Sequence, residues 1–343
     1  MRKCISVDWL QLFCDASEAV EAPGYLYNVE SYGTSNFKKI TNISLNHEPF
    51  CSIASEPTSS FMPEHSCIIK FKNRLLYSHD MIVQIQIFLE FSNMKVKGIT
   101  RLDIAVDFNY FFDSLSPHTF IRRFLKSTYL KNGRGTFTVI GEQKFMNNYQ
   151  YLRFGSKTSD VSVYLYNKTL ELRKVQDKPY IKNRWKVYGI STDVDVWRLE
   201  VSIKSQACKF VDLESGEMMK INWERLQDHD YLYNIYYSFI NQNFSFKIND
   251  GFLNKSRMKN LRLFDDSRSI YKRIKLPEVT GSNQSDKVFL KKLYLLDKEL
   301  RGMKDENQLF GKILLEKVAA NTSLDRWVEK NKDKWDKAVY REY

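Results

Sequence analysis

Residues 101–109 read RLDIAVDFN, residues 162–168 read SVYLYNK and residues 196–204 read VWRLEVSIK. In each stretch apolar and polar residues alternate with period two, which is typical of β-strands that bury one face of a sheet. The apolar sets fall on one face, and the polar sets, which hold carboxylates and tyrosines, fall on the other. The three stretches therefore predict a sheet that carries its reactive groups on a single face.

The segments around these stretches predict an α+β fold with a largely antiparallel central sheet flanked by helices, followed by a C-terminal helical extension. Strand-like segments such as VDWLQLF and SCIIKFKN fill the first hundred residues, and helical patterns follow at residues 78–94, 116–129 and 223–246. Strands and helices do not alternate with the regularity of a doubly wound fold. We expect four parts: residues 1–95 as the N-terminal part of the α+β region, 96–250 as a catalytic core, 251–285 as a basic segment and linker, and 286–343 as a helical C-terminal module.

The composition indicates a folded, basic protein that acts on a polyanion. The 343 residues carry a net charge of +12 and are 43% hydrophobic, which favours nucleic acid as the partner. The five cysteines and five histidines form no CxxC, HxH or HExxH pattern, so we expect reduced, buried thiols and no histidine metal site. The sequence DHD at residues 228–230 is interpreted as a helix cap. No signal peptide or apolar run of membrane length is evident, so we expect a cytoplasmic protein with no membrane partner.

The carboxylates of two of the alternating stretches are candidate metal ligands. Asp103 and Asp107 share one face of residues 101–109, and Glu200 lies on the polar face of residues 196–204. Aspartate is disfavoured inside strands, and a divalent cation such as Mg²⁺ or Mn²⁺ takes carboxylate, water and phosphate oxygens. The alternative interpretation is a solvent-exposed face with an ion pair between Arg101 and Asp103.

Residues 162–168 supply candidate catalytic side chains. Tyr164 and Tyr166 lie on the same strand face, and we place Lys168 on that face two residues beyond Tyr166. A phenol has a reference pKa near 10, and a fixed ammonium group lowers it or stabilises a pentacovalent phosphate. Two tyrosines on a sheet face are also common as packing against a helix, so this alternative stays open.

Positive charge is concentrated near the end of the predicted core. Residues 253–276 hold eight Lys or Arg and two Asp, a net of +6. We interpret this segment as a contact to the DNA backbone, and the alternative is a solvated helix face with a linker. The candidate DNA-binding residues on this segment and on the polar strand faces are Arg101, Arg198, Lys204, Arg268, Lys272 and Arg273.

The ordered motifs resemble those of the replication initiation factor family, which includes rolling-circle plasmid initiators and related relaxases of integrative elements and phages. The resemblance runs over about residues 95–250, through RLDIAVDFN, then YLRFGSKTSDVSVYLYNKTLELR, then VWRLEVSIK and an aromatic helix. GSKTSD and YNKxxE are its most specific parts. It implies an enzyme that nicks one DNA strand at an origin and keeps a 5′-phosphotyrosyl bond.

The resemblance also implies roles and partners for this chain. Tyr166 matches the nucleophile, with Tyr164 second, and Asp103, Asp107 and Glu200 match the acidic positions. We expect an origin that is single-stranded or hairpin DNA, and a separate helicase because no GxxxxGK[ST] motif occurs. A homodimer is a further expectation that no heptad pattern supports. Two alternatives remain open: a catalytically silent DNA-binding regulator of a mobile element, and a metal nuclease that activates water.

Overall fold

The structure, a computed structural model, describes most of the first 273 residues. The described ranges are 2–59, 62–133, 136–142, 148–156, 158–175, 177–213, 215, 218–252 and 254–273. The chain divides into two compact units, Met1–Ile274 and Lys275–Tyr343. The predicted linker after residue 276 and the predicted helical module at 286–343 lie outside the described residues.

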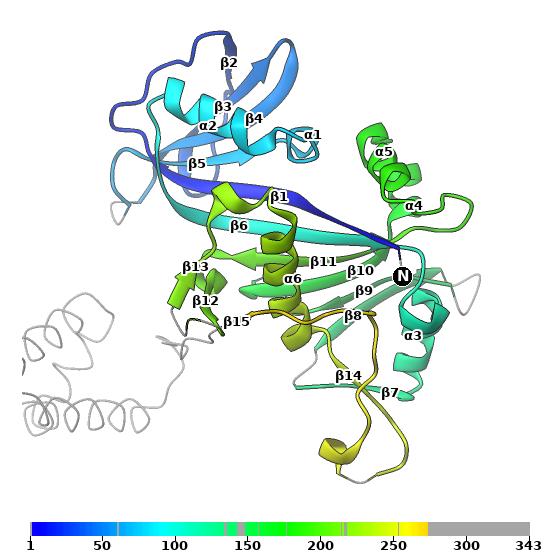
Figure 1. Cartoon of the computed structure of the whole chain (residues 1–343). Coiled ribbons are helices and arrows are strands. Elements are labelled where there is room, and N and C mark those ends of the chain that lie inside the picture. The colour runs from blue at the N-terminus through cyan, green and yellow to red at the C-terminus, as the bar shows by residue number, and fades with distance from the viewer. Residues whose placement is uncertain are drawn as a thin grey trace, which may run out of the picture. The chain divides into compact units, whose positions relative to one another are not determined.

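An antiparallel sheet forms the centre of the described part and confirms the predicted α+β class (Figure 1). Its ten strands lie in the order β2 (Tyr25–Val29), β3 (Phe37–Leu45), β4 (Glu48–Pro57), β5 (Ser66–Phe71), β1 (Lys3–Asp15), β6 (Lys95–Phe108), β11 (Trp197–Lys204), β10 (Val161–Asn167), β9 (Asn148–Phe154) and β8 (Phe137–Glu142). The N-terminal residues thus belong to the same sheet as the three motif strands, as the sequence predicts.

Helices and short elements flank this sheet. The α-helices are α1 (Asn73–Leu76), α2 (Met81–Phe91), α3 (Pro117–Leu125), α4 (Lys168–Lys174), α5 (Pro179–Val187) and α6 (His229–Asn243). Two small sheets contain β12 (Lys209–Asp212), β13 (Met218–Lys220) and β15 (Tyr271–Arg273), and β7 (Tyr129–Lys131) with β14 (Phe246–Ile248). Single 3₁₀ turns occur at Phe112–Ser114, Ser205–Ala207, Trp223–Arg225 and Lys255–Arg257.

Helix α6 covers the apolar face of the motif strands. Figure 1 shows it lying across β6, β11 and β10, whose alternate apolar residues are almost fully buried. The Tyr236 hydroxyl, on the buried side of α6, donates to the Leu199 carbonyl at 2.9 Å. The Asp228 carboxylate accepts from the backbone N–H groups of Asp230 and Tyr231, so DHD is a helix cap as predicted. One face of the sheet is therefore closed by a helix.

The strand register places the predicted polar residues side by side on the opposite face. Tyr164 pairs with Glu200, and Tyr166 pairs with Arg198. Between β11 and β6, Arg198 opposes Asp107, and Ser202 opposes Asp103. Directly opposed residues point to the same side of a sheet. We call this side of β1, β6, β11 and β10 the polar face.

Three local expectations differ from the structure. β10 ends at Asn167, whose side chain caps α4 by accepting from the Leu170 N–H at 3.0 Å. Lys168 is therefore the first residue of a helix and does not continue the strand face. The sequence analysis predicts no element at residues 48–57, where strand β4 lies. Residues 254–273 contain a 3₁₀ turn and a short strand, so the solvated-helix interpretation of this segment is wrong for its described part.

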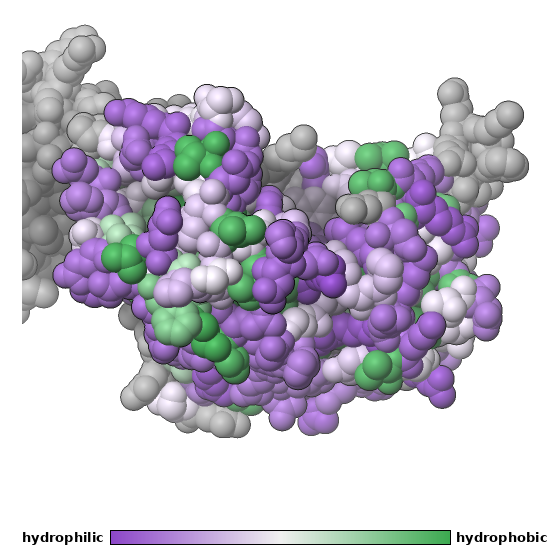
Figure 2. All heavy atoms as spheres, turned by 90° about the horizontal axis from the view of Figure 1, so that it is seen from above, coloured by the Kyte–Doolittle hydropathy of each residue, from purple (hydrophilic) through white to green (hydrophobic). Residues whose placement is uncertain are grey.

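The interior and the surface follow the sequence expectations in other respects. All five cysteines are free and buried. Seen from above, the surface is mainly hydrophilic, and hydrophobic side chains form small separate patches on the side that is shown (Figure 2). Among the described residues, no helix is both long and apolar enough to cross a membrane.

Candidate active site

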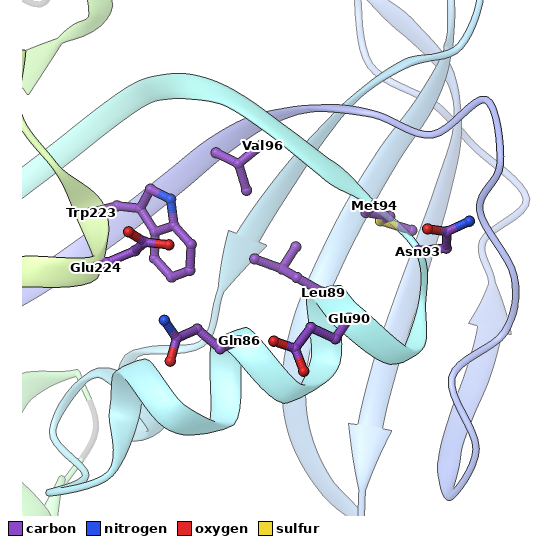
Figure 3. Close-up of a pocket in the computed structure, with 8 residues that line it drawn as sticks. All are labelled: Gln86, Leu89, Glu90, Asn93, Met94, Val96, Trp223 and Glu224. Atoms are coloured by element: carbon purple, nitrogen blue, oxygen red, sulfur yellow. The ribbon is translucent and has the colours of Figure 1, made fainter.

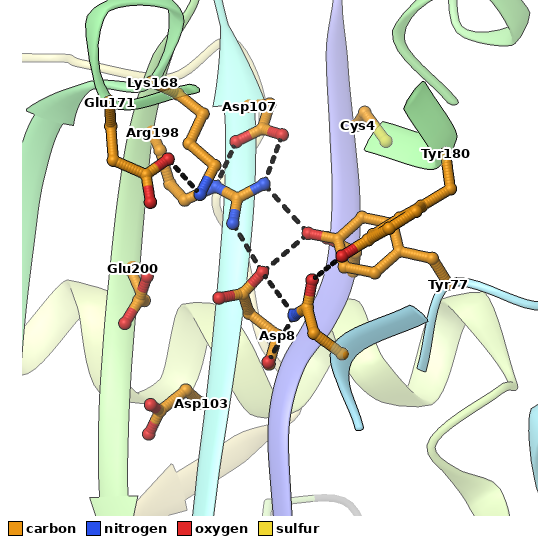
Figure 4. A network of polar contacts seen from close by, with 12 residues as sticks. Cys4, Asp8, Tyr77, Asp103, Asp107, Lys168, Glu171, Tyr180, Arg198 and Glu200 are labelled. Carbon is orange, nitrogen blue, oxygen red and sulfur yellow. Dashed lines mark hydrogen bonds and ion pairs between the residues drawn. The ribbon is translucent and has the colours of Figure 1, made fainter. Parts of the chain in front are cut away.

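A buried arginine organises one end of the polar face (Figure 4). Arg198 is 0% exposed. Its Nε and Nη2 donate to the two oxygens of Asp107 at 2.6 and 2.7 Å, and its Nη1 donates to Asp8 Oδ1 at 2.5 Å. Nη2 also donates to the Tyr77 hydroxyl at 2.8 Å. Because every guanidinium nitrogen has a protein partner, Arg198 does not fit the predicted contact to DNA.

Asp107 is committed to the same network. Both of its oxygens accept from Arg198, and its Oδ2 also accepts from the Trp185 indole at 2.7 Å. The carboxylate is 1% exposed. Asp107 therefore stabilises the buried arginine and positions α5, and its geometry does not fit the predicted metal ligand.

Asp8 is a site residue that the sequence analysis missed. Its Oδ1 accepts from Arg198, from the Tyr77 hydroxyl at 2.8 Å and from the Asn73 amide at 3.2 Å. The pairing of β1 with β6 shifts between Val7 and Trp9, so Asp8 lies in a bulge. Burial alone would raise the pKa of this carboxyl, but the charges of Arg198 and Lys168 and hydrogen bonds hold it below its usual value. An aspartate inside the β-rich segment VDWLQLF was the available signal.

Tyr166 and Glu200 form the central contact of the site. The Tyr166 hydroxyl donates to Glu200 Oε2 at 2.8 Å. Burial and the Glu200 charge raise the pKa of Tyr166 well above its ordinary value. Tyr164 lies next to them on the polar face, with its ring 6.2 Å from that of Tyr151. Of the two tyrosines of SVYLYNK, Tyr166 is the one whose hydroxyl bonds a carboxylate of this face.

Glu200 lies in a strongly negative environment. Burial and the nearby carboxylates of Asp8 and Asp103 together raise its pKa from 4.5 to about 8, against the opposing charge of Arg198. Asp103 accepts from Arg101 at 2.5 Å, yet burial still raises its pKa. Figure 4 shows Asp8, Asp103 and Glu200 in one region in front of the sheet. At neutral pH Glu200 is therefore mostly protonated unless a cation offsets the negative charge.

Replacement of Glu200 by Gln should stabilise the protein at alkaline pH. A carboxyl with a raised folded-state pKa contributes stability that is present below its unfolded pKa and is lost as the pH rises through about 8. Glutamine does not ionise and still accepts from Tyr166. At pH 9 we expect Glu200→Gln to unfold at a temperature several degrees higher than the unchanged protein, which corresponds to a stabilisation on the order of 1–3 kcal/mol. Near pH 5 the two unfolding temperatures should be equal. The prediction would be contradicted by a difference in unfolding temperature that does not vary with pH, or by one equal to that of the control Glu224→Gln, which changes an exposed glutamate.

The predicted metal site is not preformed as a cluster of three ligands. Within the described residues, no three His, Cys, Asp or Glu side chains are grouped closely enough to hold a metal ion. Mg²⁺ often binds through one or two carboxylates and completes its shell with water and substrate phosphate oxygens. The accumulated negative charge around Glu200 fits such a cation. The metal itself stays a prediction.

Lys168 approaches the site from the first turn of α4. Its ammonium group lies 5.5 Å from the centre of the Tyr166 ring and forms a 2.7 Å ion pair with Glu171. The side chain is 2% exposed, and burial and the Arg198 charge lower its pKa. The residues of YNKxxE thus come together through the helix that follows β10, not through the strand face.

The other predicted DNA-binding residues lie in two places. Arg101 and Lys204 oppose each other on the polar face, and Arg101 holds Asp103. Arg268 is 97% exposed, and Lys272 and Arg273 belong to β15 of the three-stranded sheet. The structure therefore brings Arg101 and Lys204 to the candidate site and leaves the basic segment on another sheet.

A pocket of about 420 Å³ lies outside this site, beside the C-terminal half of α2 (Figure 3). Leu89, Met94, Val96 and Trp223 line it together with Glu90 and Glu224. Its two carboxylates make it unsuited to a polyanion. None of the predicted site residues lines this pocket.

Comparisons with known proteins add a weak likeness. No family model matches the sequence, and no curated protein matches it. One similar solved structure is the rolling circle replication initiator protein from Geobacillus stearothermophilus, with a TM-score of 0.46 and 14% identity over 76% of this chain and 93% of that chain. At this score and identity the likeness is too weak to assign a function.

Proposed function

We propose that this protein is an endonuclease that nicks one DNA strand and becomes joined to the new 5′ end through Tyr166. The observation that carries the proposal is the 2.8 Å contact from the Tyr166 hydroxyl to Glu200 on a face that holds two further carboxylates. A tyrosine nucleophile needs a group that accepts its proton, and Glu200 is in position. The resemblance of YNKxxE to the replication initiation factor family supports the same assignment.

The proposed step is a transesterification at phosphorus. The Tyr166 oxygen forms a bond to the phosphorus as the P–O3′ bond breaks, and the Tyr166 proton passes to Glu200. The departing 3′ oxygen takes a proton from water and becomes a free 3′-hydroxyl. Because a phosphotyrosyl diester replaces a phosphodiester, attack of that hydroxyl reverses the step without ATP. Lys168 contributes a fixed positive charge close to the Tyr166 ring.

A divalent cation fits this proposal. Because no three carboxylates of the described residues are grouped closely enough to hold an ion, Glu200 would hold it together with water and phosphate oxygens. The ion would supply positive charge that offsets the phosphate and the nearby carboxylates of Asp103 and Asp8. Its charge would favour the ionised form of Glu200 at neutral pH, which is the form that accepts the Tyr166 proton. Asp107 is not a candidate ligand because Arg198 and Trp185 occupy its oxygens, and both Asp103 oxygens likewise accept from Arg101.

One assay distinguishes the proposal from its two alternatives. The protein is incubated with Mn²⁺ and single-stranded oligonucleotides from its origin, and the products are separated under denaturing conditions. The proposal predicts a protein–DNA adduct that survives denaturation and a free 3′-hydroxyl fragment. Cleavage without an adduct would favour a water-activating nuclease, and binding without cleavage would favour a silent regulator. Helicase recruitment, a hairpin origin and dimerisation stay predictions.

A further inference from the structure

Three cations form a straight row across the polar face. Lys70 on β5 opposes Gln11 on β1, Gln11 opposes Arg101 on β6, and Arg101 opposes Lys204 on β11. Residues that oppose one another in successive strand pairs share one side of the sheet. We call Lys70, Arg101 and Lys204 the cation row. Neighbouring strands lie about 4.8 Å apart, so the row spans roughly 14 Å.

A tryptophan fixes two members of the row. The Lys70 ammonium lies 3.7 Å from the centre of the Trp9 ring, and the Arg101 guanidinium carbon lies 4.2 Å from it. β5 and β6 flank β1 on its two sides, so the cations reach the indole from opposite strands. The Trp9 indole also donates to the Gln11 side chain at 3.3 Å. Cation–π contacts of this kind restrain side chains that are otherwise mobile.

Positive charge exceeds negative charge at the Lys70 end of the row. Asp103 pairs with Arg101, but among the described residues no carboxylate forms an ion pair with Lys70. Lys70 is partly buried, and its charged neighbours are Lys72 and Arg101. Holding like charges together on a half-buried surface is unfavourable unless an anion binds there. The arrangement is therefore suited to a polyanion.

The row has a defined position relative to Tyr166. Lys204 lies four residues along β11 from Glu200, a separation of about 13 Å at the usual strand rise. Ser202 and Asp103 lie between them on the same face. A strand of DNA attacked at Tyr166 would cross the row after a few nucleotides. Tyr164 and Tyr151 offer ring surfaces on the other side, toward β9.

We propose that the cation row, held in place by Trp9, binds the sugar-phosphate backbone of single-stranded DNA a few nucleotides from the phosphate that is cleaved. The row lies on the flat sheet face that carries the candidate nucleophile, and a flat basic surface with aromatic side chains fits an extended strand. This inference rests on the proposed function. It assigns Lys70 and Trp9 a role that no sequence motif suggested.

Binding of a fluorescent single-stranded oligonucleotide, measured by anisotropy at several salt concentrations in a Tyr166→Phe background, tests this inference without cleavage. We expect Lys70→Gln with Lys204→Gln to bind about tenfold more weakly at 100 mM salt and to lower the slope of log affinity against log salt by about 1.4. Lys70→Arg with Lys204→Arg should restore both. The matched control is Lys38→Gln with Lys126→Gln, which removes two exposed lysines elsewhere.

Either of two results would overturn the inference: an affinity and slope equal to those of the control pair, or a loss seen with duplex DNA but not with the single strand. Thermal unfolding of each variant shows that the fold is intact. Failure of the unchanged protein to form an adduct would count against the proposed function alone, since this binding assay needs no chemistry.

Discussion

We expect Tyr166→Phe to lower the yield of the covalent protein–DNA adduct by on the order of 10³-fold or more, whereas Tyr164→Phe should keep most of it. Phenylalanine retains the ring beside Lys168 and removes only the hydroxyl that donates to Glu200. Loss of a nucleophile removes a whole catalytic route, so the effect should far exceed the loss of one positioning contact. The measurement is the yield of denaturation-resistant adduct with a single-stranded origin oligonucleotide and Mn²⁺.

Tyr164→Phe is the matched control, because both tyrosines occupy the same strand and the same face. Both variants should bind the oligonucleotide as the unchanged protein does. If Tyr166→Phe forms the adduct at the full rate, Tyr166 is not the nucleophile. If Tyr164→Phe abolishes the adduct instead, the roles of the two residues are reversed.

Arg198→Met should cause the largest loss of stability, about 3–5 kcal/mol, or roughly 10 °C in unfolding temperature. Methionine fills much of the volume but leaves Asp107 without its two guanidinium donors and Asp8 without its counter-charge. Since Arg198 and Asp107 are 0% and 1% exposed, water cannot replace those contacts cheaply. Thermal or denaturant unfolding measures the effect.

A second substitution separates the destabilisation caused by the unpaired Asp107 charge from the destabilisation caused by lost packing. Adding Asp107→Leu to Arg198→Met removes the uncompensated carboxylate and should recover about 1–3 kcal/mol. Arg268→Met, which changes a 97% exposed arginine, should shift stability by less than about 0.5 kcal/mol. A loss for Arg198→Met no larger than for Arg268→Met would contradict the structural role of the network.

Period-two alternation was sufficient to predict that β6, β10 and β11 join one sheet and that their polar residues share a face. Between Leu102 and Phe108 of β6, from Val161 to Leu165 of β10 and throughout β11, every second residue is apolar, and the pattern is strong enough to fix which side chains share a face. Glu200, Tyr164 and Tyr166 therefore lie together as predicted. Alternation does not say how the strands are ordered or what covers each face, which depends on α6 and on contacts far apart in the sequence.

The partners of the charged residues could not be predicted in this way. Arg198 and Asp107 lie on the predicted face, but a neighbour from β1, Asp8, and one from α5, Trp185, turn them into a buried network. Asp8 lies in a β-bulge, which interrupts the period-two alternation of β1. The alternation therefore does not assign Asp8 to the polar face. Lys168 was placed on the strand face because it is two residues beyond Tyr166, but Asn167 caps α4 and ends the strand before it.

The most direct test of the central claim is to locate the DNA attachment by mass spectrometry of the unchanged protein. The adduct is digested with trypsin and nuclease, and the modified peptide is fragmented to assign the tyrosine that carries the nucleotide. We predict a 5′-phosphonucleotide on Tyr166 and an unmodified Tyr164. Attachment to Tyr164, or to a tyrosine outside β10, would contradict the proposal that Glu200 presents Tyr166 as the nucleophile.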